Sequence, residues 1–235
     1  MLIYIVRHGL TEWNKLKKLQ GAADVPLAKE GILLAEKTGE ALRDVKFDIC
    51  FTSPLSRAKQ TAEYVLGKRD VPIIPDKRIQ EIDFGVLEGD QVRDADGNYI
   101  DPQIETFFRA PVNFKRPEKG EDIFDVIART KDFWDEITSD PTLADKTILV
   151  ASHGCAVRAL LQNVDPDPEN FWRGSVPPNC CVNLVEVKNG KTTLLEEDRV
   201  YAIENNEKRR ITVMAVLRFF FCLFFIGRIS QVMID

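Results

Sequence analysis

The sequence predicts an α/β fold of three layers, α/β/α, around a mostly parallel central sheet, and three observations lead to it. Strand-like runs alternate with amphipathic segments from residue 1 to about residue 200, as in successive βαβ units. The runs 2–6 and 147–151 are apolar and rich in β-branched residues, which is typical of strands buried on both faces. A polar motif containing a histidine follows each of these two runs.

Hydrophobic periodicity and turn signals place the other elements along the chain. The expected elements are, in chain order, strand 2–6, helix 29–43, strand 47–51, a helix from Thr52-Ser53-Pro54 through Val65 with Gly67 as its end signal, helix 122–137, strand 147–151, helix 155–162 and strand 181–187. Residues 88–121 are charged and contain Pro and Gly without a clear period. We expect an insertion or lid over a pocket there.

The composition changes abruptly after Glu204, which predicts a domain at 1–204 and an atypical C-terminal tail at 205–235. The tail is first basic and then almost wholly apolar over the 17 residues 211–227, with Arg218 inside that run. A membrane-spanning helix needs roughly 20 apolar residues. Four interpretations stay open: a packed terminal helix or strand, weak membrane contact at an interface, a homodimer contact, or a sequence altered late in its reading frame.

Composition excludes some classes of partner. A formal net charge of -5 over 235 residues gives no global reason to bind nucleic acid or an anionic membrane, so an anion site would have to be a local cluster of arginines. The 5 cysteines are an odd number without CxxC spacing, which favours reduced thiols. The chain begins with a strand-like run and not with a leader pattern. We expect a cytoplasmic protein that does not bind nucleic acid.

The chain has only 2 histidines, and both occupy positions suited to phosphate chemistry. Arg7-His8-Gly9 follows the first buried strand, and Ser152-His153-Gly154 follows the strand 147–151. Ligands bind at the carboxyl ends of strands in open α/β sheets, so the two motifs can converge on one pocket. A neutral imidazole is a good nucleophile towards phosphorus when cations hold the phosphoryl oxygens.

Other residues could complete such a site. Arg7 and Arg57 both lie at strand-to-helix junctions, and a guanidinium matches the geometry of phosphate oxygens. Thr11 and Asn14 follow His8 and could add a hydroxyl and an amide donor, unless they are merely turn and capping residues. Glu81 could protonate a leaving oxygen and later act as a base, provided that it is partly buried near the phosphate.

Four ordered motifs then resemble one family. The stretches are Arg7-His8-Gly9 continued by Thr11-Glu12-Trp13-Asn14, Ser53 to Ala62, Glu81 to Gly89, and Ser152 to Arg158. Together they resemble the Arg-His-Gly, Ser-x-x-Arg-Ala-x-x-Thr-Ala, Glu-x-x-x-Gly-x-x-Glu-Gly and Ser-His-Gly-x-x-x-Arg motifs of the histidine phosphatase superfamily, also called the phosphoglycerate mutase-like family. They span most of the predicted domain.

The resemblance implies a role for each matching residue. The phosphorylated nucleophile would be His8, and the acid and later base would be Glu81. The residues implied to bind phosphate or substrate are Arg7, Thr11, Asn14, Gln20, Gly21, Arg57, His153 and Gly154, of which Arg7, Arg57 and His153 form the catalytic phosphate pocket. Members of the family need no metal, and no cofactor is expected.

Some assignments keep an alternative. Glu81 could instead form a structural ion pair, with Glu12 or Glu88 as the acid. Arg158 is expected to be structural because it falls inside the helix that follows His153. The three tryptophans, Trp13, Trp134 and Trp172, are expected to pack, and Cys155 is expected to be an unreactive buried thiol.

The family resemblance leaves the reaction open, because a phosphohistidine can transfer its phosphoryl group to water or to a second hydroxyl. Mutases of the family carry an adjacent pair of arginines after a tryptophan, whereas residues 90–119 contain no such pair. We therefore expect a phosphomonoester hydrolase that acts on a small phosphorylated metabolite, with specificity set by 90–119. A phosphoglycerate mutase using the same phosphohistidine and a non-catalytic binding module are the alternatives.

Overall fold

A six-stranded sheet with the order β3-β2-β4-β1-β5-β6 forms the centre of the fold in the described residues. The computed structural model describes residues 1–201. The strands are β1 (Leu2–Arg7), β2 (Ile49–Thr52), β3 (Ile73–Pro75), β4 (Thr147–Ser152), β5 (Val182–Lys188) and β6 (Lys191–Arg199). Strands β1 to β4 pair in parallel, and β5 and β6 pair antiparallel at one side. The mostly parallel sheet predicted from the sequence is confirmed.

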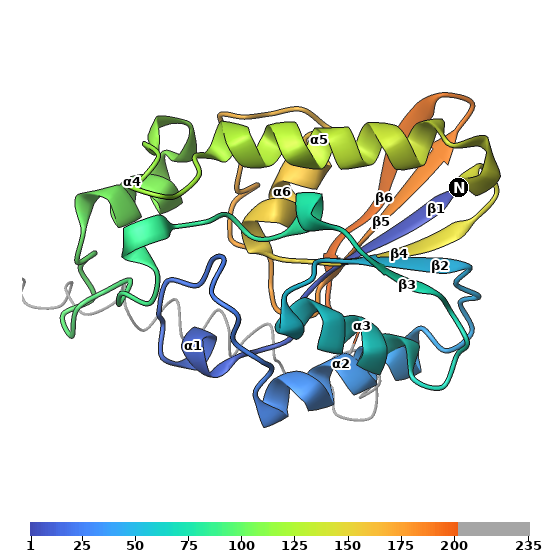
Figure 1. The fold of residues 1–235 in the computed structure, drawn as a ribbon, viewed down its shortest axis with the longest axis horizontal. Coiled ribbons are helices and arrows are strands. Elements are labelled where there is room, and N and C mark those ends of the chain that lie inside the picture. Colours follow the sequence, from blue (N-terminus) through green and yellow to red (C-terminus); the bar gives the residue numbers. More distant parts are fainter. Residues whose placement is uncertain (202–235) are drawn as a thin grey trace, which may run out of the picture. The chain divides into compact units, whose positions relative to one another are not determined.

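Helices cover both faces of this sheet (Figure 1). They are α1 (Glu12–Lys15), α2 (Lys29–Ala41), α3 (Ser56–Leu66), α4 (Pro102–Arg109), α5 (Ile123–Ser139) and α6 (Gly154–Leu161), with short 3₁₀ helices η1 (Lys77–Ile79), η2 (Gly85–Leu87), η3 (Pro111–Asn113) and η4 (Pro141–Leu143). α2 and α3 lie on one side of the sheet, and α5 and α6 lie on the other. The predicted three-layer architecture is therefore confirmed.

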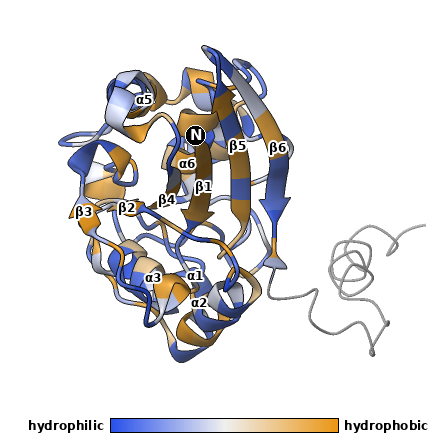
Figure 2. Ribbon diagram, turned by 90° about the vertical axis from the view of Figure 1, so that its right-hand side faces the viewer, coloured by the Kyte–Doolittle hydropathy of each residue, from blue (hydrophilic) through white to orange (hydrophobic). Residues whose placement is uncertain are grey.

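The buried strands explain why their sequences are apolar throughout. Successive side chains of a strand point to opposite faces: Ile3 and Ile5 pack into the core under α5, and Tyr4 and Val6 pack into the core under α2 and α3. Figure 2 shows this hydrophobic colour on β1 in the middle of the sheet, whereas β6 at the edge is mostly hydrophilic. Burial on both faces thus replaces the alternation that a half-exposed strand would show.

The register between β1 and β4 brings the two histidines to the same sheet edge. Arg7 pairs with Ser152 at the last position of the two parallel strands. His8 and His153 therefore leave the sheet side by side, and the backbone N–H of His8 donates to the carbonyl of Ser152 over 2.9 Å. α3 starts close to the same edge, because β2 pairs with the other side of β4.

Residues 88–121 form an insertion whose buried side chains Ile104, Phe107 and Phe114 share one hydrophobic cluster with the rest of the domain. α4 begins after Asp101, whose side chain accepts a hydrogen bond from the Gln103 N–H. The insertion packs on the rest of the domain through Phe107, whose ring lies edge-on to Phe84 at 4.8 Å and to Trp172 at 5.1 Å between centroids. Edge-to-face pairs of this kind add to simple apolar burial. The segment is therefore more ordered than its sequence pattern predicts.

Several boundaries differ from the sequence predictions, and the strands β3 and β6 and the short helices α1 and α4 were not predicted. The helix expected from Thr52 begins at Ser56, because Thr52 belongs to β2 and the Ser53 N–H donates to the carbonyl of Ala151. The helix expected through residue 43 ends at Ala41. β3 has only 3 residues, none of them buried, and β6 is a charged edge strand in which exposed and half-exposed residues alternate, so neither carries an apolar strand signal.

The predictions for the tail 205–235 lie outside the described residues, and the first compact unit of the chain is Met1–Ala202. Within the part that the structure describes, no helix is long and apolar enough to cross a membrane. Cytoplasmic location and the homodimer contact stay predictions.

The contact between α2 and α3 depends on Gly39. A Cβ at this position would lie 2.5 Å from the carbonyl oxygen of Val65 and 2.8 Å from that of Tyr64. We expect Gly39→Ala to lower the free energy of unfolding, because overpacking against rigid backbone costs about 1–3 kcal/mol and exceeds the gain of roughly 1 kcal/mol in helix propensity. Urea unfolding of this variant beside the exposed-site control Lys37→Ala checks it. A Gly39→Ala protein more stable than wild type would contradict the packing account.

Candidate functional site

His8 and His153 meet at the carboxyl ends of β1 and β4. Their ring centroids are 5.2 Å apart, and 3% of His8 and 0% of His153 is exposed to solvent. Two imidazoles buried this closely cannot both carry a charge at low cost, because burial disfavours the ionised form of each. Burial therefore favours the neutral form of both rings.

The hydrogen bond of His8 leaves its second ring nitrogen free. Nδ1 lies 2.7 Å from the carbonyl oxygen of Gly9, and a carbonyl only accepts, so Nδ1 carries the proton and Nε2 keeps its lone pair. Burial, together with the positive charges of Arg57 and Arg7, holds the pKa of His8 well below 6.5. His8 is thus a neutral imidazole with a nucleophilic Nε2 at physiological pH.

Arg57 sets the opposite tautomer in His153. Its Nε–H donates to Nδ1 of His153 over 3.1 Å, which requires the proton of His153 to sit on Nε2. That Nε2 is buried and has no hydrogen-bond partner among the described residues. Burial and the charge of Arg57 also hold the pKa of His153 well below 6.5. The result is an unpaired N–H donor beside His8, which is costly unless a ligand accepts it.

The guanidinium of Arg57 is held by a loop at residues 21–23. Nη2 donates to the carbonyl of Gly21 over 2.6 Å, and Nη1 donates to that of Ala23 over 2.7 Å. Because a guanidinium has five N–H groups, these bonds leave one N–H on each terminal nitrogen. Burial lowers the pKa of Arg57 to about 10, so it remains cationic at neutral pH.

Glu88 anchors that loop from below. Its carboxylate accepts from the backbone N–H groups of Gly21, Ala22, Ala23 and Phe84 at 2.8–3.3 Å. A Cβ at position 21 would lie 2.2 Å from the carbonyl oxygen of Ile82, so glycine is needed for this close approach. From the sequence, Glu88 was expected only as a substitute acid, whereas in the structure its carboxylate positions the backbone that holds Arg57.

Glu81 sits against the N-terminus of α6. Its carboxyl oxygens accept from the N–H of Cys155 at 3.1 and 3.2 Å and from the N–H of Ala156 at 3.2 Å. Burial raises the pKa of Glu81 above its usual 4.5, although Arg57 and these N–H groups act in the opposite direction. A carboxyl with a raised pKa in a pocket is typical of a general acid.

Arg7 supplies a second buried cation. Its Nη1 donates to the carbonyl of Pro177, and its Nε is buried without a hydrogen-bond partner in the described part of the chain. Burial lowers the pKa of Arg7, while the charge of Glu81 raises it. Gly154 keeps the space between these groups open, since a Cβ there would lie 3.5 Å from both Arg7 Nε and Glu81 Oε2.

Thr11, Asn14 and Gln20 form a bonded group beside the site. The Thr11 hydroxyl donates to Gln20 Oε1 over 2.5 Å and accepts from the Asn14 N–H over 3.1 Å. Thr11 and Asn14 therefore make a capping box for α1, which is the structural interpretation raised for them. Asn14 and Gln20 also line the pocket, and Gln20 Nε2 is a buried donor without a described partner.

A pocket of about 460 Å³, counted with its open mouth, lies over these groups. Its polar end contains Arg7, Asn14, Gln20, Glu81 and Gly154. Its apolar walls contain Leu19, Phe84, Val92, Phe107, Phe108, Trp172 and Val176, and Lys18 is the one lining cation besides Arg7. The pocket thus combines a polar part suited to an anion with largely hydrophobic walls.

The predicted site residues fall into three groups. Arg7, Asn14, Gln20, Glu81 and Gly154 line the pocket, while His8, Arg57 and His153 lie buried beside it. Thr11 and Gly21 form hydrogen bonds to other site residues, Thr11 to Gln20 and Gly21 to Arg57. Arg158 is structural as expected, with its guanidinium donating to Asp198 over 2.5 Å. Burial raises the pKa of the Cys155 thiol well above 9, which agrees with an unreactive thiol.

Sequence reasoning missed the apolar walls. Residues 90–119 do line the pocket, but through Val92, Phe107 and Phe108 and not through the charged residues of that segment. Trp172 was expected only to pack. It packs against Phe107 and donates from Nε1 to the carbonyl of that residue over 2.9 Å, and it also lines the pocket. The helical spacing of Ile104, Phe107 and Phe108 was the available signal.

The arrangement can hold and transfer a phosphoryl group. It offers a neutral nucleophilic nitrogen, two buried cations, an unpaired N–H donor and a protonatable carboxyl within one site. A dianion would accept from the unpaired donors and balance the cations. Among residues 1–201, no group of histidine, cysteine or acidic side chains is arranged to hold a metal ion.

Known proteins share this sequence pattern and fold. A family model described as histidine phosphatase superfamily (branch 1) matches residues 3–198. A 2,3-bisphosphoglycerate-dependent phosphoglycerate mutase of Mesorhizobium japonicum is 35% identical over 168 residues, covering 69% of this chain and 81% of that protein. PhoE, an uncharacterized phosphatase of Bacillus subtilis, is 31% identical over 188 residues, covering 78% of this chain and 87% of that protein.

Solved structures show the same likeness. YhfR of Bacillus stearothermophilus has a TM-score of 0.78 and 31% identity, covering 86% of this chain and 99% of that chain. A phosphoserine phosphatase of Entamoeba histolytica in complex with 3-phosphoglyceric acid has a TM-score of 0.70 and 25% identity, covering 83% of this chain and 95% of that chain. Mutases and phosphatases thus both occur among similar proteins.

The lowered pKa of His153 makes stability depend on pH. In the unfolded chain His153 binds a proton near pH 6.5, whereas in the folded chain it does so only at lower pH. The contribution of neutral His153 to the free energy of unfolding is therefore fully present above pH 6.5 and is lost as pH falls towards the folded pKa. We expect the free energy of unfolding of wild type to fall more steeply below pH 6.5 than that of His153→Gln, by up to about 1.4 kcal/mol per pH unit. Urea unfolding from pH 7.5 to 5.5 measures both slopes, and parallel curves would show that His153 is not held neutral.

Proposed function

We propose that this chain, which belongs to the histidine phosphatase superfamily (branch 1), is a metal-independent phosphomonoester hydrolase that acts through a phosphohistidine on His8. The observation that carries the proposal is the pair of opposite tautomers. The bond from Nδ1 to Gly9 frees Nε2 of His8 for attack, while the bond from Arg57 makes His153 a donor. One ring can thus act as nucleophile while its neighbour binds the group being transferred.

In the first step, Nε2 of His8 attacks the phosphorus of the ester and the bond to the leaving oxygen breaks. The phosphoryl oxygens accept from the free N–H groups of Arg7 and Arg57 and from Nε2–H of His153. These donors are already placed in a buried site, where fixed dipoles and charges stabilise a transition state more than they do in water. Attack turns His8 into a cation, and the adjacent phosphoryl charge compensates it.

Glu81 is the proposed acid for this step. Its protonated carboxyl gives a proton to the leaving oxygen, so that an alcohol departs and not an alkoxide. In the second step the Glu81 carboxylate takes a proton from water as that water attacks the phosphoryl group. Nε2 of His8 then leaves as the neutral ring, and inorganic phosphate is the second product. The burial that raises the Glu81 pKa supports both roles.

The pocket supports hydrolysis of a small phosphorylated metabolite over mutase chemistry. A phosphoglycerate carboxylate would need cations beyond the phosphate end, and in the described pocket Lys18 alone could offer one. The walls favour an alcohol part with apolar surface. The relatives named as phosphoglycerate mutases and Lys18 keep the mutase as the second candidate. The complete set of buried cations and neutral nucleophile argues against a non-catalytic binding module.

The proposal is tested with the full chain in the presence of a chelator. The panel contains p-nitrophenyl phosphate, 3-phosphoglycerate with and without 2,3-bisphosphoglycerate, and several sugar phosphates, with free phosphate and isomers both followed. We expect phosphate release by wild type and its loss in His8→Ala, because no other described neutral imidazole has a free Nε2 lone pair in the site. Isomer formation without release would make the chain a mutase, and undiminished activity of His8→Ala would contradict the mechanism.

Glu81→Gln should slow esters with poor leaving groups far more than esters with good ones, by up to about 10²–10⁴-fold for the poor ones. The active form needs neutral His8 and protonated Glu81. The rate on alkyl esters should therefore fall on the acidic side as His8 becomes protonated, with a pKa well below 6.5. It should also fall on the alkaline side as Glu81 loses its proton, with a pKa above 4.5.

The fall at higher pH should be absent in Glu81→Gln, and kcat/KM against pH for phenyl and alkyl phosphates measures it. Glu88→Gln is the matched control. It should slow all esters alike because Glu88 holds the loop under Arg57. A leaving-group dependence in Glu88→Gln and not in Glu81→Gln would reassign the acid.

A further inference from the structure

The segment that carries Glu81 has neither a helical nor a strand ladder to hold it. Residues 80–84 lie between η1 and η2, and an extended segment outside a sheet must satisfy its backbone groups elsewhere. Position matters here, because the Glu81 carboxyl must reach both α6 and the bound ester. The side chains that satisfy this backbone therefore control where the proposed acid lies.

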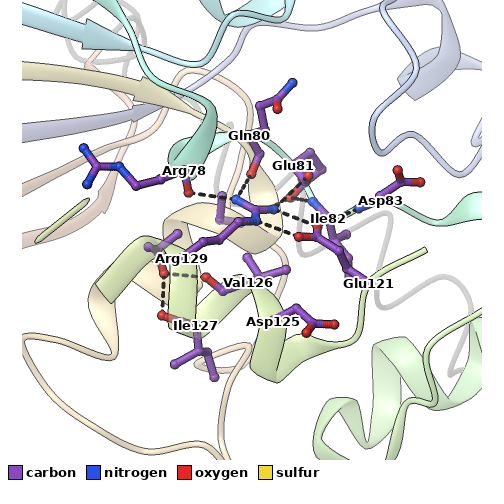
Figure 3. Close-up of polar contacts among 12 residues, drawn as sticks. Arg78, Gln80, Glu81, Ile82, Asp83, Glu121, Asp125, Val126, Ile127 and Arg129 are labelled. Atoms are coloured by element: carbon purple, nitrogen blue, oxygen red, sulfur yellow. Dashed lines mark hydrogen bonds and ion pairs between the residues drawn. The ribbon is translucent and has the colours of Figure 1, made fainter. Parts of the chain in front are cut away.

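One guanidinium binds the first two carbonyls of this segment and one carbonyl of η1 just before it, as Figure 3 shows. Nη1 of Arg129, on α5, donates to the carbonyls of Arg78 and Gln80, each over 2.8 Å, and Nη2 donates to the carbonyl of Glu81 over 3.0 Å. The remaining N–H groups of Arg129 go to Glu121, from Nε over 2.8 Å and from Nη2 over 3.0 Å. All five N–H groups of Arg129 are thus used.

Glu121 completes the clamp on the far side of Glu81. Its Oε2 accepts from the N–H of Asp83 over 3.0 Å, and its own N–H donates to the carbonyl of Asp83 over 2.8 Å. The Arg129 and Glu121 side chains are 19% and 26% exposed. The ion pair therefore binds backbone on both sides of Glu81 from a single direction, and neither partner lines the pocket.

We propose that Arg129, aligned by Glu121, is a positioning residue that holds the carboxyl of Glu81 where it can protonate the leaving group. The proposal rests on the proposed function, in which Glu81 is the acid. Three carbonyls and one carboxylate accept hydrogen bonds from Arg129, and the planar guanidinium points its N–H groups at them in fixed directions. A lysine could not replace it fully, because its three donors come from one nitrogen. Arg129 makes no contact with substrate in this account and acts only through Glu81.

The test compares Arg129→Met, Arg129→Lys and wild type on p-nitrophenyl phosphate and on an alkyl phosphate. A displacement of the acid by about 1 Å can cost about 10²-fold. We expect Arg129→Met to lower kcat for the alkyl ester by about 10-fold or more, with KM nearly unchanged and p-nitrophenyl phosphate much less affected. Arg129→Lys should be intermediate, and it also serves if Arg129→Met does not fold.

Arg116→Met is the matched control. Arg116 also pairs with a carboxylate of α5, Asp125, at 2.5 Å, and is 57% exposed, but none of its described hydrogen bonds goes to the Glu81 segment. It should leave the ratio of alkyl to nitrophenyl rates at the wild-type value. A change in this ratio as large as that in Arg129→Met would overturn the proposal, because it would make the effect general to α5.

A double-mutant cycle separates positioning from stability. If Arg129 acts through Glu81, adding Arg129→Met to Glu81→Gln should change the alkyl ester rate by less than about 2-fold, since interacting residues are not additive. An undiminished effect on that background, or equal slowing of both esters, would overturn the positioning role. Wild type without turnover, or Glu81→Gln without leaving-group dependence, would instead show that the proposed function itself fails.

Discussion

The site depends on the buried guanidinium of Arg57. A charge with 0% exposure needs partners inside the protein, and Arg57 has three of them, two loop carbonyls and the Nδ1 of His153, while its two remaining N–H groups are left for an anion. Burial, together with this charge, lowers the pKa of both histidines, and the charge also partly counteracts the effect of burial on the pKa of Glu81. Removing Arg57 would therefore alter a tautomer, three pKa values and a loop conformation at once.

The fold brings these groups together through sheet topology. His8 follows β1 and His153 follows β4, while Arg57 lies in the first turn of α3 after β2, and these three strands are neighbours in the sheet. Parallel strands end at one edge, so residues far apart in sequence become adjacent there. Two groups farther out, the Glu88 carboxylate at the loop and the ion pair of Arg129 with Glu121 behind Glu81, fix backbone that the sheet does not reach.

Much of the fold and the core of the site could be predicted from the sequence, because the polar motifs at strand ends are strong local signals. The buried strands, the helices after them and the convergence of His8 with His153 follow from apolar runs and their polar ends. The roles of Glu88 and the pocket-lining phenylalanines depend on contacts between distant segments. Their residue types have common structural explanations, a surface acid or a packing aromatic, so local pattern alone does not reveal them. β6 escaped prediction because an exposed edge strand need not be apolar.

The central claim is that the phosphoryl group passes through Nε2 of His8. Rapid quenching of wild type during turnover of a ³²P-labelled phosphomonoester, with chelator present, measures it most directly. The account predicts an acid-labile, alkali-stable phosphoryl group on His8, formed at least as fast as turnover and absent from His8→Ala. Turnover at the wild-type rate with no labelled histidine, or with the label on another residue, would contradict the account.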